Sequence, residues 1–235
     1  MNKHENKHTS NQAGQARRTR ARILGVTAAV VVGVIVGVSA GTNASAASVR
    51  TTAVTKFVSG PPGPEAVPRQ TGTVLAPAST AATGQSVDGI QCNTAEQVAF
   101  HVHTHLAVYV NGRLRPIPAG IGIVMPAAQA TPEGPFYQAT QCYYWLHVHA
   151  QDGVIHIESP AGHTYTLGQF FDLWGQPLSA NQVGPAKGKL TTYVGGRLYR
   201  GNPRNIRLGS HVDIQIDVGR PAVSPRSVNW AVTSL

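Results

Sequence analysis

The stretch YYWLHVHAQDGVIHIESP, residues 143–160, contains the clearest fold signal in the chain. Asp152 and Gly153 form a dipeptide typical of a two-residue hairpin turn, and apolar and polar residues alternate on both sides of it. One face of the predicted hairpin is apolar: Leu146, Val148, Ile155 and Ile157. The other face carries four candidate metal ligands: His147, His149, His156 and Glu158. The stretch therefore predicts an antiparallel hairpin with one apolar face and one histidine-bearing face.

The turn also predicts the register of this hairpin. With Asp152 and Gly153 at the bend, His149 lies opposite His156, and His147 lies opposite Glu158. Directly opposed side chains have Cβ atoms about 5 Å apart.

A second hairpin is predicted in FHVHTHLAVYVNGRLRPIP, residues 100–118, with its turn at Asn111-Gly112. Three histidines share one face of its first strand: His101, His103 and His105. This turn predicts that His105 lies opposite Pro118 and that His103 lies opposite Gly120. Each hairpin is thus expected to bury its apolar side and to present histidines on the other.

The remaining pattern predicts one more hairpin, a helix and a last strand. A Gly195-Gly196 turn lies within TTYVGGRLYRGNP. In TLGQFFDLWGQP, Thr166 and Gln169 form a capping box, an apolar stripe follows at helical spacing, and Gly175 can end the helix. The sequence HVDIQIDVG alternates as an amphipathic strand. The predicted fold is α+β, mainly antiparallel β hairpins with one short helix.

The histidine pattern indicates a site for a divalent transition metal. Neutral imidazole binds Zn²⁺ and Cu²⁺, and two histidines at positions i and i+2 of a strand project side by side. Glu158 can act as a ligand, as an acceptor for an imidazole N–H, or as a general base. Sulfur ligands are few, which disfavours a methionine-rich copper(I) carrier; the choice between zinc and copper stays open.

The chain has two cysteines, Cys92 and Cys142. An even pair in an exported protein is most simply a disulfide, and the alternative is a pair of thiolate metal ligands.

The first forty residues resemble a targeting or anchoring segment. A basic cytoplasmic leader over residues 1–22 precedes an uncharged apolar run at 23–40, which is long enough to span a bilayer as a helix. The positive charges predict a single-pass protein with its N-terminus inside and its C-terminal domain outside. A cleaved signal peptide is the alternative, because the small residues ASA at 44–46 offer a cleavage site; the protein would then be secreted.

Composition divides the rest of the chain. Residues 41–89 are rich in Ala, Ser, Thr, Pro and Gly, and predict a disordered stalk. The expected histidine-rich β domain covers residues 90–221 and is followed by a C-terminal tail at 222–235. The net charge of +9 arises largely in the leader, and basic residues do not cluster with aromatic ones, so no nucleic-acid partner is expected.

Residues 89–219 resemble a family of uncharacterised bacterial exported or membrane-anchored proteins. The resemblance rests on H-x-H in HVHTHLAVYVNG, on L-H-x-H-x-x-x-G-x-I-H-x-E in LHVHAQDGVIHIE, and on TLGQFFDLWGQPL. It implies an exported domain but no specific activity.

Three functions fit this sequence. The first is a membrane-tethered extracytoplasmic domain that binds a divalent metal ion. The second is a zinc or copper enzyme with three histidine ligands. The third is a structural or partner-binding envelope domain without metal, its protein partner unknown. No nucleophile motif or phosphate-binding glycine loop is evident, so the sequence favours binding over catalysis.

Overall fold

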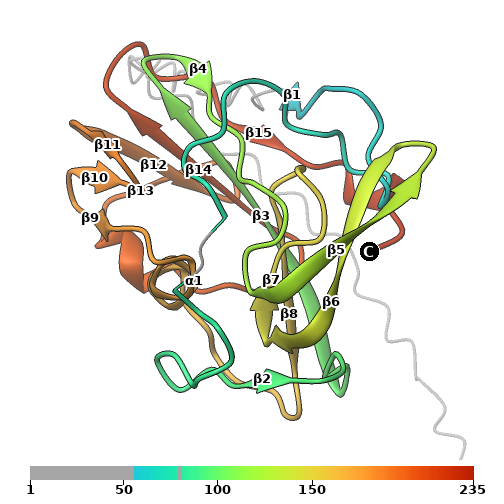
Figure 1. The fold of residues 1–235 in the computed structure, drawn as a ribbon. Helices are drawn as coiled ribbons and strands as arrows, with labels where there is room; N and C mark the ends of the chain where they lie inside the picture. The colour runs from blue at the N-terminus through green and yellow to red at the C-terminus, as the bar shows by residue number, and fades with distance from the viewer. Residues whose placement is uncertain (1–55, 79–80) are drawn as a thin grey trace, which may run out of the picture. The chain divides into compact units, whose positions relative to one another are not determined.

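A computed structural model describes residues 56–78 and 81–235. Its largest sheet has seven strands in the order β13-β12-β14-β3-β8-β7, with β4 also paired to β3 (Figure 1). All but one of the pairings within this sheet are antiparallel; β14 and β3 run parallel. The strands are β3 (Phe100–Val110), β4 (Arg113–Leu114), β7 (Leu146–His147), β8 (Val154–Ser159), β12 (Leu190–Val194), β13 (Arg197–Tyr199) and β14 (Val212–Val218).

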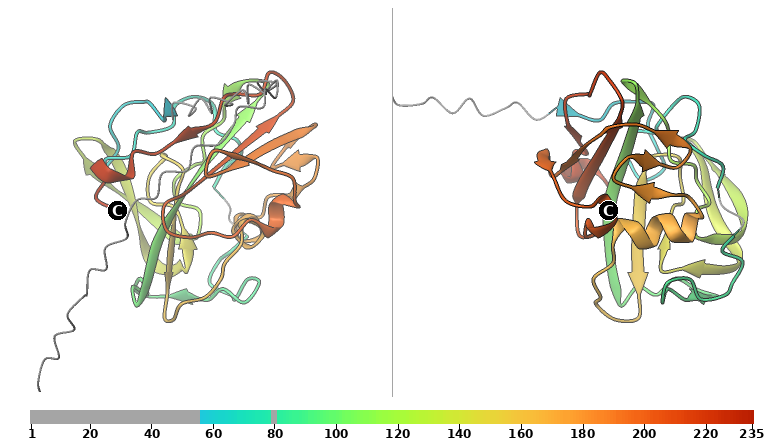
Figure 2. Two further views of the ribbon diagram at one scale, coloured as in Figure 1. Left: turned by 180° about the vertical axis from the view of Figure 1, so that it is seen from behind. Right: turned by 90° about the vertical axis from the view of Figure 1, so that its left-hand side faces the viewer.

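Three smaller sheets complete the β structure of the described residues, and β5 and β6 form a long hairpin that projects beside the main sheet (Figures 1 and 2). The pairings are β2-β6-β5, β11-β10-β9 and the parallel pair β1-β15. The strands are β1 (Lys56–Phe57), β2 (Cys92–Asn93), β5 (Ile123–Thr131), β6 (Gly134–Tyr144), β9 (Leu178–Ser179), β10 (Gln182–Val183), β11 (Ala186–Lys187) and β15 (Arg226–Ser227).

The helix α1 (Leu167–Trp174) forms as predicted. Thr166 and Gln169 make both hydrogen bonds of the capping box, and Gly175 ends the helix in the left-handed conformation at φ 67°. Its apolar stripe is fully buried against the apolar side of the main sheet. Two short 3₁₀ helices, η1 (Pro203–Asn205) and η2 (Trp230–Val232), also occur.

The described residues therefore confirm a mainly antiparallel α+β fold with one α-helix. The hairpin turns at Asn111-Gly112 and at Gly195-Gly196 are confirmed, because Val110 pairs with Arg113 and Val194 pairs with Arg197. A disulfide joins Cys92 on β2 to Cys142 on β6.

The prediction of a disordered stalk is wrong for residues 56–78 and 81–89. These residues pack on the domain: Val67 is fully buried, and Leu75 is 3% exposed within the main core. Their few apolar residues have no periodic pattern that would predict a helix or strand. Contacts with the rest of the domain bury these residues and offset the entropic cost of ordering the segment. The boundary predicted at residue 90 therefore moves toward the N-terminus.

The two terminal segments cover the histidine-bearing face of the main sheet. Val67, from before the predicted domain, and Val228, from after it, form a small apolar cluster with Val154 of β8. Val154 lies on the same face of β8 as His156 and Glu158, because strand side chains alternate. This covering converts a face expected to be open into a buried polar layer.

The predicted membrane segment at 23–40 lies outside the described residues. Within residues 56–78 and 81–235, no helix has the length and apolar character needed to span a membrane.

Candidate metal centre

Six of the seven predicted ligand residues come together on the covered face of the main sheet. They fall into two overlapping groups, and in each group one ligand atom per residue lies within 4.8 Å of the others. The first group is His101, His103, His156 and Glu158; the second is His147, His149, His156 and Glu158. Strand β3 supplies the first histidine pair, strand β8 supplies the shared residues, and β7 with the loop after it supplies the second pair.

The strand pairing that brings these residues together differs from the predicted register. His147 lies opposite His156, not Glu158, and β7 ends at that residue, so His149 lies in the following loop. The predicted two-residue turn at Asp152-Gly153 is therefore wrong, because residues 148–153 connect β7 to β8. Strand β3 pairs with β8, which places His103 opposite His156 and His101 opposite Glu158. The predicted pairing of His103 with Gly120 is therefore wrong, as is that of His105 with Pro118. The faces of β7 and β8 are as predicted, because their register is shifted by two residues, an even number.

His147 and His149 are oriented with their Nε2 atoms toward each other. The Nδ1 of His147 is 2.8 Å from the carbonyl oxygen of Tyr144, and the Nδ1 of His149 is 2.6 Å from that of Tyr137. A carbonyl oxygen only accepts hydrogen bonds, so both Nδ1 atoms must carry the proton. In the neutral rings, each Nε2 then has a free lone pair, yet the two Nε2 atoms are only 2.9 Å apart.

Two facing lone pairs repel unless a proton or a metal ion lies between them. Ligands about 2.0–2.1 Å from a tetrahedral Zn²⁺ are roughly 3.3 Å from each other, so a small outward movement of the rings admits an ion. Hydrogen bonding of the distal ring nitrogen to a backbone carbonyl is also the usual way in which proteins orient a metal-binding histidine. Phe136 stacks on His149 with a centroid distance of 4.3 Å and restricts that ring further.

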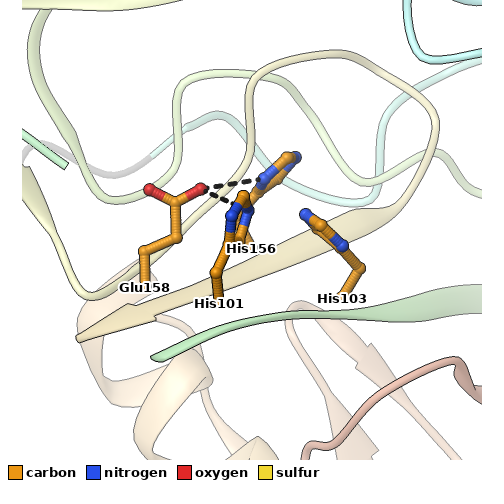
Figure 3. A group of neighbouring side chains, drawn as sticks. All are labelled: His101, His103, His156 and Glu158. Carbon is orange, nitrogen blue, oxygen red and sulfur yellow. Dashed lines mark ion pairs between the residues drawn. The ribbon is translucent and has the colours of Figure 1, made fainter. Parts of the chain in front are cut away.

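Glu158 reaches between the two histidine pairs, and Figure 3 shows it beside His101 and His156 with His103 nearby. Its Oε1 is 2.9 Å from the Nε2 of His101 and 3.4 Å from the Nδ1 of His156. Its Oε2 is 3.9 Å from the Nε2 of His147 and makes no hydrogen bond. The Nε2 of His103 is likewise buried without a hydrogen bond, whereas the Nδ1 of His156 has the 3.4 Å contact with Oε1. Unsatisfied buried donors and acceptors are costly, and a metal ion would satisfy such atoms.

Two acidic residues that the sequence analysis missed also contact the histidines. Glu65 places its Oε1 3.2 Å from the Nε2 of His156, and Glu96 places its Oε1 3.3 Å from the Nε2 of His149. Glu65 belongs to the segment predicted to be disordered, so its position depends on long-range packing. The one feature of the sequence that could have drawn attention to Glu65 and Glu96 is the scarcity of acidic residues. The whole chain has only ten, and one of them is in the leader.

The protonation of the cluster is divided between neutral and charged rings. Burial lowers the pKa of His103 to about 3, and burial likewise holds the pKa of His147 well below its usual value. Burial also disfavours a charged His156, but the carboxylates of Glu65 and Glu158 outweigh it and raise the pKa of His156 to about 10. Burial acts to raise the pKa of Glu65, yet the neighbouring His156 lowers it overall. The cluster thus combines neutral nitrogen ligands with a position that favours positive charge.

A cavity of about 540 Å³ opens onto one side of the cluster. Among its lining residues are His101, His103 and His149, with Glu65 and Glu96 at its wall. The side chain of His101 is 40% exposed, whereas that of His147 is fully buried. The centre is therefore open to solvent at His101 and closed to solvent at His147.

His105 is the one predicted ligand outside both groups. It lies on β3 with its Nδ1 3.5 Å from Oδ1 of Asp213 and its Nε2 3.5 Å from Nε2 of Gln70. Gln70 and Asp213 also bond to backbone groups of β3, the loop after β4 and the C-terminal segment. His105 therefore connects the main sheet to the segments that cover it, and it does not take part in the candidate metal centre.

Comparison of the chain with protein-family models, with curated proteins and with solved structures found no match.

Proposed function

We propose that this protein binds a divalent transition metal ion, Zn²⁺ or Cu²⁺, at a site formed by His147, His149, His156 and Glu158. The observation that carries the proposal is the pair of Nε2 atoms 2.9 Å apart, in rings that are each oriented by an Nδ1–H bond to a carbonyl oxygen. Two neutral rings in this arrangement need a cation between them, and the convergence of His156 and Glu158 on the same place supports a metal ion rather than a shared proton. Three imidazoles and a carboxylate suit either ion, and His156 must release its extra proton to become a ligand.

We further propose that the domain operates outside the cytoplasm, held at the membrane by residues 23–40. The uncharged run with arginines before it supports this orientation. The Cys92–Cys142 disulfide supports it independently, because structural disulfides persist mainly in oxidising compartments. In this setting the domain would sequester, deliver or sense a metal ion at the cell envelope.

Metal content tests the binding proposal directly. The full chain is purified without an affinity tag, and its zinc and copper are measured before and after dialysis against each ion. We expect at least one ion per chain and a melting temperature that falls on chelation. A content far below one ion, with melting unchanged by chelator, would remove the proposal and leave a structural or partner-binding domain.

Location needs a separate measurement, since the binding result does not depend on it. Protease added to intact cells should digest the domain at residues 56–235 while a cytoplasmic control protein survives. Protection of the domain until the cells are lysed would contradict the extracytoplasmic placement.

A further inference from the structure

The centre offers more ligands than one ion can use. A four-coordinate Zn²⁺ takes four ligands, but six side chains converge here. Only His156 and Glu158 belong to both groups. They lie on β8, which is between β3 and β7 in the sheet, so the two histidine pairs lie on different sides of these shared residues. The ring of His156 is 4.7 Å from that of His103 and 4.6 Å from that of His149, between centroids.

Glu158 directs one carboxylate oxygen to each side. Its Oε1 is nearest to His101, at 2.9 Å, and its Oε2 is directed toward His147, at 3.9 Å. A carboxylate with this orientation can bridge two ions, and the ions of such sites are about 3.5–4 Å apart.

The histidine pair on β3 has the properties of a ligand pair in its own right. His101 and His103 are two residues apart on one strand, and their ring centroids are 4.6 Å apart. The Nε2 of His103 is buried without a hydrogen bond, although the side chain lines the cavity. If this nitrogen binds a metal ion, the free-energy cost of burying it without a hydrogen-bond partner is removed.

We propose that His101, His103 and Glu158 form a second site for a divalent cation, next to the first, with the Glu158 carboxylate bridging the two ions. This inference rests on the proposed function, because Glu158 and the neighbouring ion belong to that site. The first ion, held by the buried pair His147 and His149, is the retained one. The second has the 40% exposed His101 as a ligand beside the 540 Å³ cavity and keeps a coordination position open, so it is the exchangeable one.

Stoichiometry of the full chain, purified without a tag and loaded with Zn²⁺, tests this proposal. We expect two ions per chain, with one removed by chelator much faster than the other. The double variant His101→Ala/His103→Ala should bind one ion, retained as slowly as the slow ion of the wild type. The double variant His147→Ala/His149→Ala should lose the slow phase. Exposed His163, replaced by alanine, is the control and should leave two ions.

Copper gives an independent readout of the bridge. Two Cu²⁺ ions about 4 Å apart couple magnetically, so the fully loaded wild type should show a spin-coupled electron paramagnetic resonance spectrum. His101→Ala/His103→Ala should show the spectrum of an isolated Cu²⁺ instead. His101 is partly exposed, so His101→Ala alone serves as a fold-preserving variant and should lower occupancy of the fast ion.

Each outcome distinguishes this inference from the proposed function. One ion per wild-type chain, unchanged in His101→Ala/His103→Ala, overturns the second site and leaves the first. Two ions with independent, uncoupled copper spectra overturn the bridging geometry. Absence of any bound ion overturns both proposals.

Discussion

The substitution His149→Ala gives the sharpest test of the buried metal site. His149 is 3% exposed, and its Nε2 is the atom that faces Nε2 of His147. Loss of a hydrogen-bonding partner of a metal ligand already weakens binding about 10–100-fold, so loss of a ligand should cost at least about 100-fold. The substitution also removes the bond to Tyr137 and the stack on Phe136, so it lowers stability without metal too.

The measurement separates these two effects. Metal at 1,000 times its Kd stabilises the folded state by about 4.1 kcal/mol, and at the same concentration a 100-fold weaker site gives about 1.4 kcal/mol. The difference is about 2.7 kcal/mol. In a domain of this size, each kcal/mol corresponds to about 2–4 °C in Tm, so the metal-induced rise in Tm should shrink by about 5–11 °C.

The assay is thermal unfolding without Zn²⁺ and with Zn²⁺ at about 1,000 times the wild-type Kd. Each variant is compared with its own metal-free form. His163→Ala is the matched control, because His163 is exposed and belongs to neither ligand group. It should keep the whole metal-induced rise. If His149→Ala also keeps the whole rise, the orientation argument for the two Nε2 atoms is refuted.

Three further predictions concern the fold around the centre. Burial, with the charge of Glu65, raises the pKa of Asp152 from 3.8 to about 8. The folded state therefore holds a proton that the unfolded chain releases above about pH 3.8, so the stability contribution of Asp152 is lost as pH rises toward 8. Asp152→Asn should gain stability relative to the wild type between pH 4 and 8 in denaturant titrations, and a pH-independent difference would contradict this. Replacement of Cys92 and Cys142 by serine should lower the free energy of unfolding by up to about 4 kcal/mol, since their separation is 50 residues; an unchanged urea midpoint would contradict it. Leu75→Ala should cost about 2–5 kcal/mol because Leu75 is 3% exposed in the core, and a cost no larger than that of a substitution at an exposed residue would mean that residues 56–78 do not pack.

Local pattern determined the parts of the structure that depend on near neighbours. The capping box at Thr166 and the left-handed Gly175 follow from residues a few positions apart, and both formed as predicted. The turn at Asn111-Gly112 is confirmed for the same reason. The alternation of side chains on β3 and β8 also fixed which residues share a face, whatever the pairing.

The tertiary structure alone decided which strands pair and what covers them. Strand β3 pairs with β8 and β14. Other strands have the same alternating pattern and could have paired with β3 equally well. The sequence pattern could therefore not identify the partners of β3. The covering segments are poor in apolar residues and gave no periodic signal. Their packing buried the histidines, excluded His105 from the cluster and brought Glu65 to His156. The sequence therefore determined which side chains could bind a metal ion, and long-range packing decided which of them meet, because contacts between distant segments leave no local pattern.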